Sequence, residues 1–388
     1  MENQIWETEP SETRRTCMLM ITHSCNLNCT YCYEKFKSEK KMSFETAKEI
    51  ILKECEIVKN DDRFDGLEID FMGGEPMVNF ELMKQIVEWG ESLPLPVPHI
   101  YFMTTNGTLF TEEAKIWFEK YKDVFWVGTS YDGTPEMQEE NRGQSKKVEM
   151  EFFYKLWPKQ GFHMTVSQET LPNLADGILA IQRKGYTLIA ALAEGISWTE
   201  DDVKIYYEQL LKLKKAYLED LSLQPINLLV HRLFINSSKQ IKNVEQKKYC
   251  GTGTYMQTYD VDGKAYGCHM FTPIVLGPRA FTSETVDWEC AANTIDPFCK
   301  ECVLKNICPT CAGFNFNYRN NIAERDKNLC TITLVQMMIA AEFQLEILTS
   351  SRKTLSDQDA SYVKLLLEAI PILQQFNPFT SRAPFVSK

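Results

Sequence analysis

The sequence has no excess of positive charge, no long apolar run and no targeting segment. Its 388 residues include 42 lysine and arginine residues against 53 aspartate and glutamate residues, which gives a net charge of −11. A protein that binds nucleic acid neutralises phosphates with cations, so this deficit argues against a nucleic-acid partner. No apolar run reaches the length of a membrane span, and residues 1–15 are polar and lack a signal-peptide core. The sequence therefore predicts a cytoplasmic protein that has neither nucleic acid nor a membrane as a partner.

Cysteine, by contrast, is abundant. The chain has 13 cysteines, and because disulfides are rare in the cytoplasm, so many thiols favour metal binding. Three of them lie within residues 25–32 and eight within residues 250–330. Cys17 lies in a strand-like apolar run and Cys55 in a helical pattern, and both are interpreted as ordinary buried residues.

The most informative motif is the spacing of Cys25, Cys29 and Cys32. Three thiolates at this spacing can hold three irons of a cubic [4Fe–4S] cluster, and the fourth iron stays open to a small molecule. A zinc site would need a fourth protein ligand nearby, and His23 is too close to Cys25 to serve easily. The spacing therefore favours an iron–sulfur cluster that takes part in chemistry.

The first 220 residues alternate short apolar runs with amphipathic segments. Six runs are expected to be strands: 17–22, 67–72, 99–104, 124–130, 162–167 and 187–192. Six segments are expected to be helices: 43–58, 79–89, 111–121, 145–157, 172–184 and 199–219. Four of these helices have an expected N-cap residue, namely Ser43, Asn79, Thr111 and Thr199.

Six strand–helix units in series predict an α/β fold with a parallel sheet and outer helices. Such sheets place active sites at the carboxyl ends of their strands, and the three-cysteine motif follows the first strand. The later sequence is rich in turns and cysteine as far as Cys330, and Asp262-Gly263 predicts a hairpin turn. Two helices, over 331–350 and 357–376, are expected to follow.

Three further motifs follow successive strands of the predicted sheet. They are Gly73-Gly74-Glu75-Pro76, Thr104-Thr105-Asn106-Gly107-Thr108 and Ser130-Tyr131-Asp132-Gly133. Each would be an ordinary loop by itself, and Arg142 in the next loop would be an ordinary surface charge. Two adjacent glycines let a ligand approach the backbone, and Glu75 can accept hydrogen bonds from an ammonium group. The shared position of these motifs on the face of the cysteines favours a binding site.

With these motifs, residues 16–230 resemble the radical S-adenosylmethionine (radical SAM) enzymes. The aromatic Tyr31 precedes the last cysteine, the GGEP sequence begins at Gly73, and an S-x-D-G element begins at Ser130. The resemblance implies a partial (β/α)6 TIM-type barrel. It also implies that one electron from the cluster cleaves SAM to methionine and a 5′-deoxyadenosyl radical, which abstracts a hydrogen atom from the substrate.

The resemblance also assigns roles to individual residues. The amino and carboxylate groups of SAM would chelate the open iron, and Tyr31 would lie among the cofactor-binding residues. Glu75 and the backbone at Gly73 and Gly74 would hold the amino group. Ser130 would contact the ribose, and Arg142 would pair with the carboxylate.

The C-terminal cysteines resemble a SPASM domain, an appendage with two auxiliary clusters found on peptide-modifying relatives. By this resemblance, cluster I takes Cys250, Cys268 and Cys311, and cluster II takes Cys299, Cys302, Cys308 and Cys330. Two residues separate Cys308 from Cys311 where the pattern usually has three. Cluster I would be completed by Cys290, which lies in a stretch with a helical pattern, or would keep an open iron or take a ligand other than cysteine. Zinc sites are the alternative interpretation of these cysteines.

These interpretations predict a radical SAM oxidoreductase with three [4Fe–4S] clusters that acts on a ribosomally made precursor peptide, by a thioether or carbon–carbon crosslink. The expected domains are a polar segment over 1–15, a radical SAM core over 16–235, a SPASM domain over 240–335 and a helical tail over 336–388. The expected partners are the peptide and an electron donor such as flavodoxin or ferredoxin. Because only about 15 residues precede the first strand, a separate leader-binding protein is a further possible partner.

Two other functions stay open from the sequence. One is an anaerobic sulfatase-maturing enzyme, which oxidises serine or cysteine to formylglycine. That family typically has an acidic base after the cysteine that is Cys268 here, whereas this chain has His269, which can act as a base near neutral pH. The other is an electron-transfer protein, which would not need the motifs at the strand ends.

Overall fold

The computed structural model describes residues 13–93, 95–230, 250–282, 286–288, 290, 295–305, 307–308, 310–350 and 355–386. The chain forms two compact units. The first combines Pro10–His163 with Cys250–Cys290, and the second combines Met1–Glu9, Met164–Tyr249 and Ala291–Lys388. We call them the N-terminal unit and the C-terminal unit. The predicted domain boundaries at residues 15, 235 and 335 stay predictions.

The strands form one sheet in the order β6-β5-β4-β3-β2-β1-β7-β8. Their bounds are β1 Arg14–Thr22, β2 Gly66–Gly73, β3 His99–Thr105, β4 Phe125–Ser130, β5 Phe162–Val166, β6 Leu188–Leu192, β7 Met256–Tyr259 and β8 Ala265–Tyr266. The pairs β1–β2, β2–β3, β3–β4, β4–β5 and β1–β7 are parallel, and β7–β8 is antiparallel. The predicted α/β fold with a parallel sheet is confirmed, and the predicted hairpin adds its last two strands.

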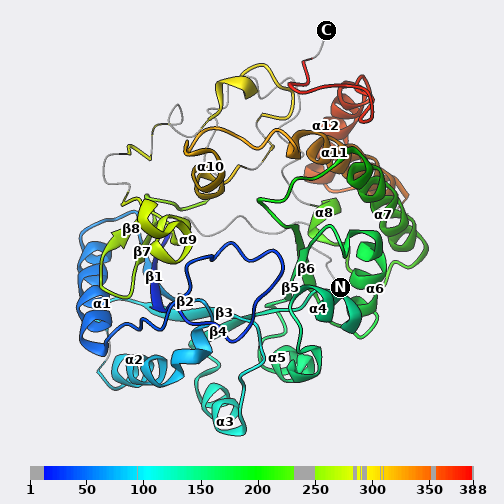
Figure 1. Ribbon diagram of the computed structural model, residues 1–388. Helices are drawn as coiled ribbons and strands as arrows, with labels where there is room; N and C mark the ends of the chain where they lie inside the picture. Colours follow the sequence, from blue (N-terminus) through cyan, green and yellow to red (C-terminus); the bar gives the residue numbers. More distant parts are fainter. Residues whose placement is uncertain are drawn as a thin grey trace. The chain divides into compact units, whose positions relative to one another are not determined.

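The N-terminal unit also contains helices, and those that follow β1, β2 and β3 lie outside its strands (Figure 1). Their bounds are α1 Phe44–Lys59, α2 Phe80–Ser92, α3 Glu112–Tyr121, α4 Pro135–Asn141, α5 Met150–Leu156 and α9 Pro273–Leu276. Ser43 and Thr111 cap α1 and α3 as predicted. Asn79 does not cap α2, because its Nδ2 donates to the carbonyl of Ile21 at 2.8 Å instead.

The two faces of the sheet in this unit differ in chemistry. Alternate side chains such as Ile69, Phe71 and Tyr101 are fully buried on the face toward the helices. The other face, which we call the inner face, carries Glu68, Asp70 and Met72 from β2, and Glu68 and Met72 are half-buried. Among the described residues, the helix-packed face is therefore apolar and the inner face carries acidic side chains.

The hairpin β7–β8 is tied to the loop after β1. Gly263 takes a φ of 81° in its turn, a conformation that glycine adopts without strain. Nε2 of the buried His23 lies 2.6 Å from Oδ1 of the buried Asp260, which precedes the turn. The segment that leads to Cys268 is therefore fixed against the start of the cysteine loop.

The C-terminal unit is mainly helical. Its helices are α6 Leu174–Gln182, α7 Glu200–Glu219, α8 Asn227–Val230, α10 Ala312–Arg319, α11 Leu329–Ser350 and α12 Asp357–Leu373. Apolar side chains of α11 and α12 pack with Leu304, Ile307 and Cys330 in one core. Both predicted C-terminal helices are confirmed, and Thr199 caps α7 as predicted.

Three expectations need correction. Helix α11 is long and apolar enough to cross a membrane by length and composition, although 61% of its apolar window is buried inside the structure, as in a core helix. The helix expected over 145–157 begins only at Met150, after a separate 3-10 turn at Ser145–Lys147. Of the stretch around Cys290, Trp288 and Cys290 are described, and neither is helical.

Candidate functional site

The loop between β1 and α1 carries Cys25, Cys29 and Cys32, which we call the first thiol set. The Cys32 N–H donates to the carbonyl of Cys29 at 3.1 Å, which closes a turn between them. The Leu27 N–H lies 3.5 Å from Sγ of Cys25. The short spacing in sequence therefore becomes a compact loop in which all three cysteines are half-buried.

Two cations lie beside these thiols. The ammonium group of Lys37 hydrogen-bonds Cys32 and faces Cys25, while the charge of Arg142 acts on Cys29. Burial raises the pKa of the Cys25 thiol to about 11 and also raises the pKa of Cys29, and the nearby cations oppose this. Cations beside thiols favour the thiolate form that metals bind.

Gly73 and Gly74 bring the cysteine loop against the end of β2. A Cβ atom on Gly73 would lie 2.3 Å from the carbonyl oxygen of Thr22, and one on Gly74 would lie 2.5 Å from that of Ser24. The Gly74 and Glu75 N–H groups donate to these same carbonyls at 3.1 and 2.9 Å. A side chain at either position would therefore clash with the backbone of the loop after β1. The sequence suggested that these glycines make room for a ligand, and the structure shows that they also let the two loops approach each other.

Glu75 is buried and its carboxylate joins the ends of β2 and β3. It accepts hydrogen bonds from Oγ1 of Thr105 at 2.7 Å, from the Asn106 N–H at 2.8 Å and from the Met77 N–H at 3.1 Å. Burial raises the pKa of Glu75, although these hydrogen bonds lower it in part. Because a carboxylate has about four acceptor positions, this network leaves little room for a further donor.

Asn106 also fixes the cysteine loop through Asn26. Nδ2 of Asn106 donates to Oδ1 of Asn26 at 2.9 Å, and Nδ2 of Asn26 donates to Oγ1 of Thr108 at 2.8 Å. Oδ1 of Asn106 accepts from the backbone and the hydroxyl of Thr108 at 3.0 and 2.7 Å. The loop after β3 therefore holds the loop after β1 by side-chain hydrogen bonds.

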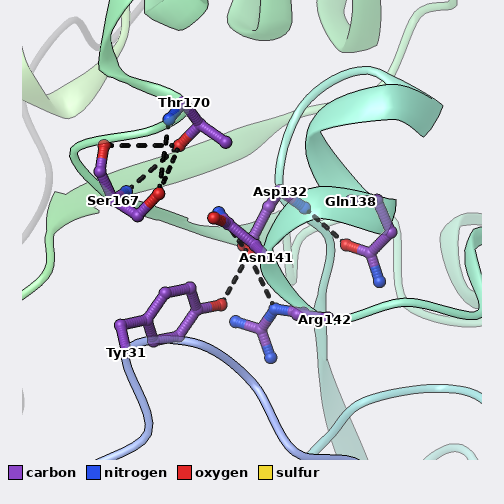
Figure 2. A network of polar contacts seen from close by, with 7 residues as sticks. All are labelled: Tyr31, Asp132, Gln138, Asn141, Arg142, Ser167 and Thr170. Carbon is purple, nitrogen blue, oxygen red and sulfur yellow. Dashed lines mark hydrogen bonds and ion pairs between the residues drawn. The ribbon is translucent and has the colours of Figure 1, made fainter.

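Asp132, at the end of β4, forms the centre of a second polar network. Figure 2 shows Tyr31, Asn141 and Arg142 pointing toward its carboxylate. The Tyr31 hydroxyl lies 2.5 Å from Oδ2, Nε of Arg142 lies 2.9 Å from it, and Nδ2 of Asn141 lies 3.1 Å from it. The Thr30 N–H also donates to the carbonyl of Asn141 at 2.9 Å, so the cysteine loop is held to β4 and α4 as well.

Arg142 packs on the same loop. Its guanidinium lies 5.3 Å from the centroid of the Tyr31 ring, a cation–π distance. Burial disfavours the charge of Arg142, but Asp132, Tyr31 and Cys29 together raise its pKa by more, so the guanidinium stays charged. The structure thus places the positive charge of Arg142 beside Cys29. The sequence analysis predicted that Arg142 pairs with the carboxylate of SAM, and that pairing stays a prediction.

Ser130 and His269 also lie in this unit. Ser130 is buried as the last residue of β4, next to the predicted loop. Nε2 of His269 lies 3.1 Å from the Tyr33 hydroxyl, and Nδ1 lies 3.6 Å from Sγ of Cys268. Burial lowers the pKa of His269, so its imidazole is neutral near pH 7 and chemically able to accept a proton.

The donor set of the first thiol set fits an iron–sulfur cluster better than a single ion. Among the described residues, no group of three or more His, Cys, Asp or Glu side chains converges as a site for one metal ion. Each thiolate of a cubic cluster binds a different iron, so its ligands lie farther apart than those of one ion. Three thiols flanked by two cations also match the negative charge of such a cluster.

Two cysteines of predicted cluster I are close together in the N-terminal unit. Oγ1 of Thr252 lies 3.0 Å from Sγ of Cys250, and its side chain also hydrogen-bonds the buried Cys268. The Cys290 N–H donates to Oδ1 of Asp287 at 3.2 Å. Cys311 belongs to the C-terminal unit, so the complete predicted set stays a prediction.

The four cysteines predicted for cluster II gather in the C-terminal unit. We call Cys299, Cys302, Cys308 and Cys330 the second thiol set, and the charges of the other three act on Cys330. The buried guanidinium of Arg325 hydrogen-bonds Cys330, and its charge also acts on Cys299 and Cys308. Burial raises the pKa of Cys330 to about 12 and that of Cys299 to about 11. Three of these thiols lie beside the charge of Arg325, which fits an anionic cluster, and the assignment of all four cysteines to one cluster stays a prediction.

Sequence reasoning did not select Asp132, Asn26 or Asn106 as site residues. Asp132 and Asn106 lie in motifs that follow predicted strands, so their position was a usable signal. Asn26 lies directly after Cys25, where only the spacing of the cysteines was considered. In general, a polar residue at the end of a strand is a candidate for holding a nearby loop that carries metal ligands.

Comparison with known proteins gives one family match and several partial relatives. Residues 19–156 match the model of the radical SAM superfamily. An uncharacterised protein of Methanocaldococcus jannaschii is 38% identical over 117 residues, which cover 30% of this chain and 38% of that protein. The radical SAM cyclopropyl synthase TigE of Paramaledivibacter caminithermalis is 27% identical over 135 residues, which cover 31% of this chain and 28% of TigE. The matches therefore span less than two fifths of either relative.

Two groups of solved structures share the fold over most of the chain. The structure of anSMEcpe with bound AdoMet and the Cp18Cys peptide has a TM-score of 0.63 and 17% identity, over 85% of this chain and 97% of that one. Streptococcus suis SuiB bound to the precursor peptide SuiA has a TM-score of 0.51 and 14% identity, over 82% of this chain and 76% of SuiB. At these identities the likeness concerns the fold, and it extends beyond the radical SAM segment.

Proposed function

The chain carries a radical SAM domain, and from this premise we propose that it is an enzyme that modifies a ribosomally made precursor peptide. The observation that carries the proposal is the attachment of the cysteine loop to the ends of β2, β3 and β4. The Glu75 N–H donates to the carbonyl of Ser24, Asn106 holds the loop through Asn26, and Asp132 holds it through Tyr31. A loop fixed at three strand ends is suited to present a cluster to a substrate at the carboxyl edge of the sheet.

The first thiol set would hold a [4Fe–4S] cluster, which together with bound SAM supplies a 5′-deoxyadenosyl radical that takes a hydrogen atom from the substrate. Arg142, held at Nε by Asp132, would pair with the carboxylate of SAM. Tyr31, whose hydroxyl is held by the carboxylate of Asp132, would lie beside SAM. Ser130 would contact the ribose. The backbone next to Gly73, Gly74 and Glu75 would hold the amino group.

The substrate class is inferred from the relatives. Structures of two proteins with this fold contain a bound peptide, and TigE is a radical SAM cyclopropyl synthase. We infer a peptide substrate for this chain and a crosslink, either thioether or carbon–carbon, as the product. The reaction would need an electron donor such as flavodoxin or ferredoxin, and a separate protein could bind the leader of the peptide. These parts would work together in the cytoplasm.

Two auxiliary clusters are also proposed, held by the cysteines between 250 and 330. The second thiol set would hold one of them, because four thiols and Arg325 lie together. Cys250, Cys268 and Cys311 would hold the other, with Cys290 or an open iron completing it. Cys250 and Cys268 both contact Thr252, which supports their joint assignment.

A second candidate function is the oxidation of a serine or cysteine of a sulfatase to formylglycine. The observation that favours it is the neutral imidazole of His269, which lies next to Cys268 and contacts Tyr33. A neutral imidazole can take the proton that leaves the substrate hydroxyl or thiol.

The first experiment tests the proposed chemistry without a substrate. Protein reconstituted without oxygen, given SAM and a reductant, should release 5′-deoxyadenosine. Changing Cys25, Cys29 and Cys32 to alanine should abolish the release, because the ligands of the cluster are lost. Cys55→Ala is the matched control, since Cys55 is a thiol of α1 that belongs to neither set, and it should retain the release. Release from the triple variant would contradict the proposal.

A second experiment separates the two candidate functions. Crosslinking and formylglycine formation from serine each remove two hydrogens, so the mass of the product does not distinguish them. Hydrazine labelling does, because an aldehyde reacts whereas a thioether or carbon–carbon bond does not. An unreactive product that resists proteases supports peptide crosslinking. A labelled product that His269→Ala no longer forms supports the second function.

A further inference from the structure

The inner face of the sheet contains a buried carboxyl group that the network at the strand ends does not use. Asp70 lies on β2 and is 8% exposed. Its Oδ1 has no hydrogen-bond partner among the described residues. Unsatisfied polar atoms of this kind are rare in folded proteins, and each calls for an explanation such as a missing ligand.

The surroundings of Asp70 are mostly apolar and aromatic. In the parallel register, Asp70 lies opposite Met18 of β1 and Phe102 of β3, and Phe102 lies opposite Trp126 of β4. Phe102 and Trp126 are only half-buried, so this row of side chains is accessible from the inner face. Aromatic faces of this kind attract cations, and the methylenes of a lysine or arginine side chain can pack on methionine.

The charges around Asp70 disfavour its own ionisation. Glu68 lies two residues away on the same face, and burial and this second carboxylate raise the pKa of Asp70 to about 8, while His269 lowers it in part. Glu68 is itself affected, since burial raises its pKa and Arg14 and Thr16 lower it. A cationic group placed at Asp70 would relieve the repulsion between the two carboxylates.

The position along β2 connects Asp70 to the reaction. Asp70 precedes Gly73 by three residues, which in a strand corresponds to about 10 Å. The same strand therefore carries the proposed cofactor-binding motif at its end and, below it, the carboxyl group whose Oδ1 has no partner among the described residues, at a distance that about three residues of an extended peptide span.

We propose that Asp70 anchors a positively charged side chain, lysine or arginine, of the peptide substrate on the inner face of the sheet. This inference rests on the proposed function and adds a substrate class to it. The carboxylate would accept charge-assisted hydrogen bonds from the ammonium or guanidinium group. Phe102 and Trp126 would lie beside the methylene groups of that lysine or arginine side chain. Asp70 is thus a specificity-determining residue.

The test is a ligand-observed NMR titration of the reconstituted full chain with SAM at fixed ionic strength. The probes are N-acetyl-Ala-Lys-Ala-amide and the same peptide with norleucine, which keeps the methylenes and lacks the charge. The lysine peptide should bind about tenfold more tightly. Asp70→Asn should remove this preference. Asp62→Asn, which removes an exposed carboxylate outside the sheet, should keep it.

Several outcomes would overturn the inference. They are equal affinities for the two peptides, no measurable binding of the lysine peptide, and a preference that survives in Asp70→Asn. If Asp70→Asn does not fold, the comparison of the two peptides on the unchanged protein still decides. Release of 5′-deoxyadenosine is measured on the same preparation, so a failure of the proposed function is distinguished from a failure of this inference alone.

Discussion

The two thiol sets are held in opposite ways. The loop of the first set is fixed by polar contacts, from Asn26 to Asn106 and from Tyr31 to Asp132. In the second set, Cys302, Cys308 and Cys330 pack against the apolar core formed by α11 and α12. The first set therefore lies on a loop that polar side chains position, and the second is part of what holds a unit of the fold together.

This difference indicates that cysteine thiolates serve two kinds of cluster in this chain. A polar loop at the edge of a sheet can leave one iron open to a small molecule, which SAM chemistry needs. Thiols within an apolar core favour a closed cluster that is shielded from water and suited to electron transfer or to stability. The following predictions test this comparison, from the largest expected effect to the smallest.

Removing three ligands of the second set should destabilise the protein most. In Cys302→Ala/Cys308→Ala/Cys330→Ala the proposed cluster is lost from the core, and metal binding of this kind contributes on the order of 10 kcal/mol to folding. The melting temperature, followed by circular dichroism without oxygen, should fall by at least about 10 °C. The triple variant of the first set should lose much less, and equal losses would remove the distinction between the sets.

Asp132→Ala should have the next largest effect, on the first set. It leaves the buried Arg142 without its partner and releases Tyr31, and breaking a buried ion pair costs about 3–5 kcal/mol. The rate of 5′-deoxyadenosine release should fall by about a hundredfold. Asp132→Asn keeps an acceptor for Tyr31 and should lose less. Unchanged release from the alanine variant would show that this network does not position the site.

Asn106→Ala should have a smaller effect on the same loop. The substitution removes the side-chain bonds to Asn26 and Thr108 and keeps the backbone bond to Glu75. The KM for SAM should rise by about tenfold, because two or three hydrogen bonds that position the loop are lost. Asn60→Ala, at the exposed end of α1, is the control and should leave KM unchanged. Equal KM values for the two variants would contradict the positioning role of Asn106.

Arg325→Gln should shift the reduction potential of the proposed cluster at the second thiol set. Of the four variants, it should affect SAM cleavage least. Removing a buried positive charge beside the thiols should lower the reduction potential of the cluster by on the order of 50 mV. The measurement is a redox titration followed by electron paramagnetic resonance. Arg325→Lys retains the charge and should shift the potential less. A potential that does not move in the glutamine variant would show that this cation does not tune the cluster.

Much of this comparison could be predicted from the sequence. The strands of the N-terminal unit followed from apolar runs, and the cysteine spacing located the first set, because both depend on residues that are near in sequence. Helix α4 was missed even though Thr134 caps it and Pro135 opens it, a local signal that a seven-residue helix makes easy to overlook.

The contacts between loops could not be predicted in the same way. Asn79 is a residue type that commonly caps helices, but its side chain donates to a carbonyl of β1, 58 residues earlier in the sequence. The reason for Gly73 and Gly74 was also hidden, since it depends on how closely the loop after β1 approaches β2. Such contacts are set by tertiary packing, which the pattern of one segment does not contain.

The most direct test of the account is to measure iron and 5′-deoxyadenosine on the same anaerobic preparations. The unchanged protein should bind about 12 irons, four for each of three cubic clusters, and should cleave SAM. The triple alanine variant at Cys25, Cys29 and Cys32 should keep about 8 irons and lose cleavage completely. A variant that still cleaves SAM, or zinc in place of iron at the second thiol set, would contradict the account.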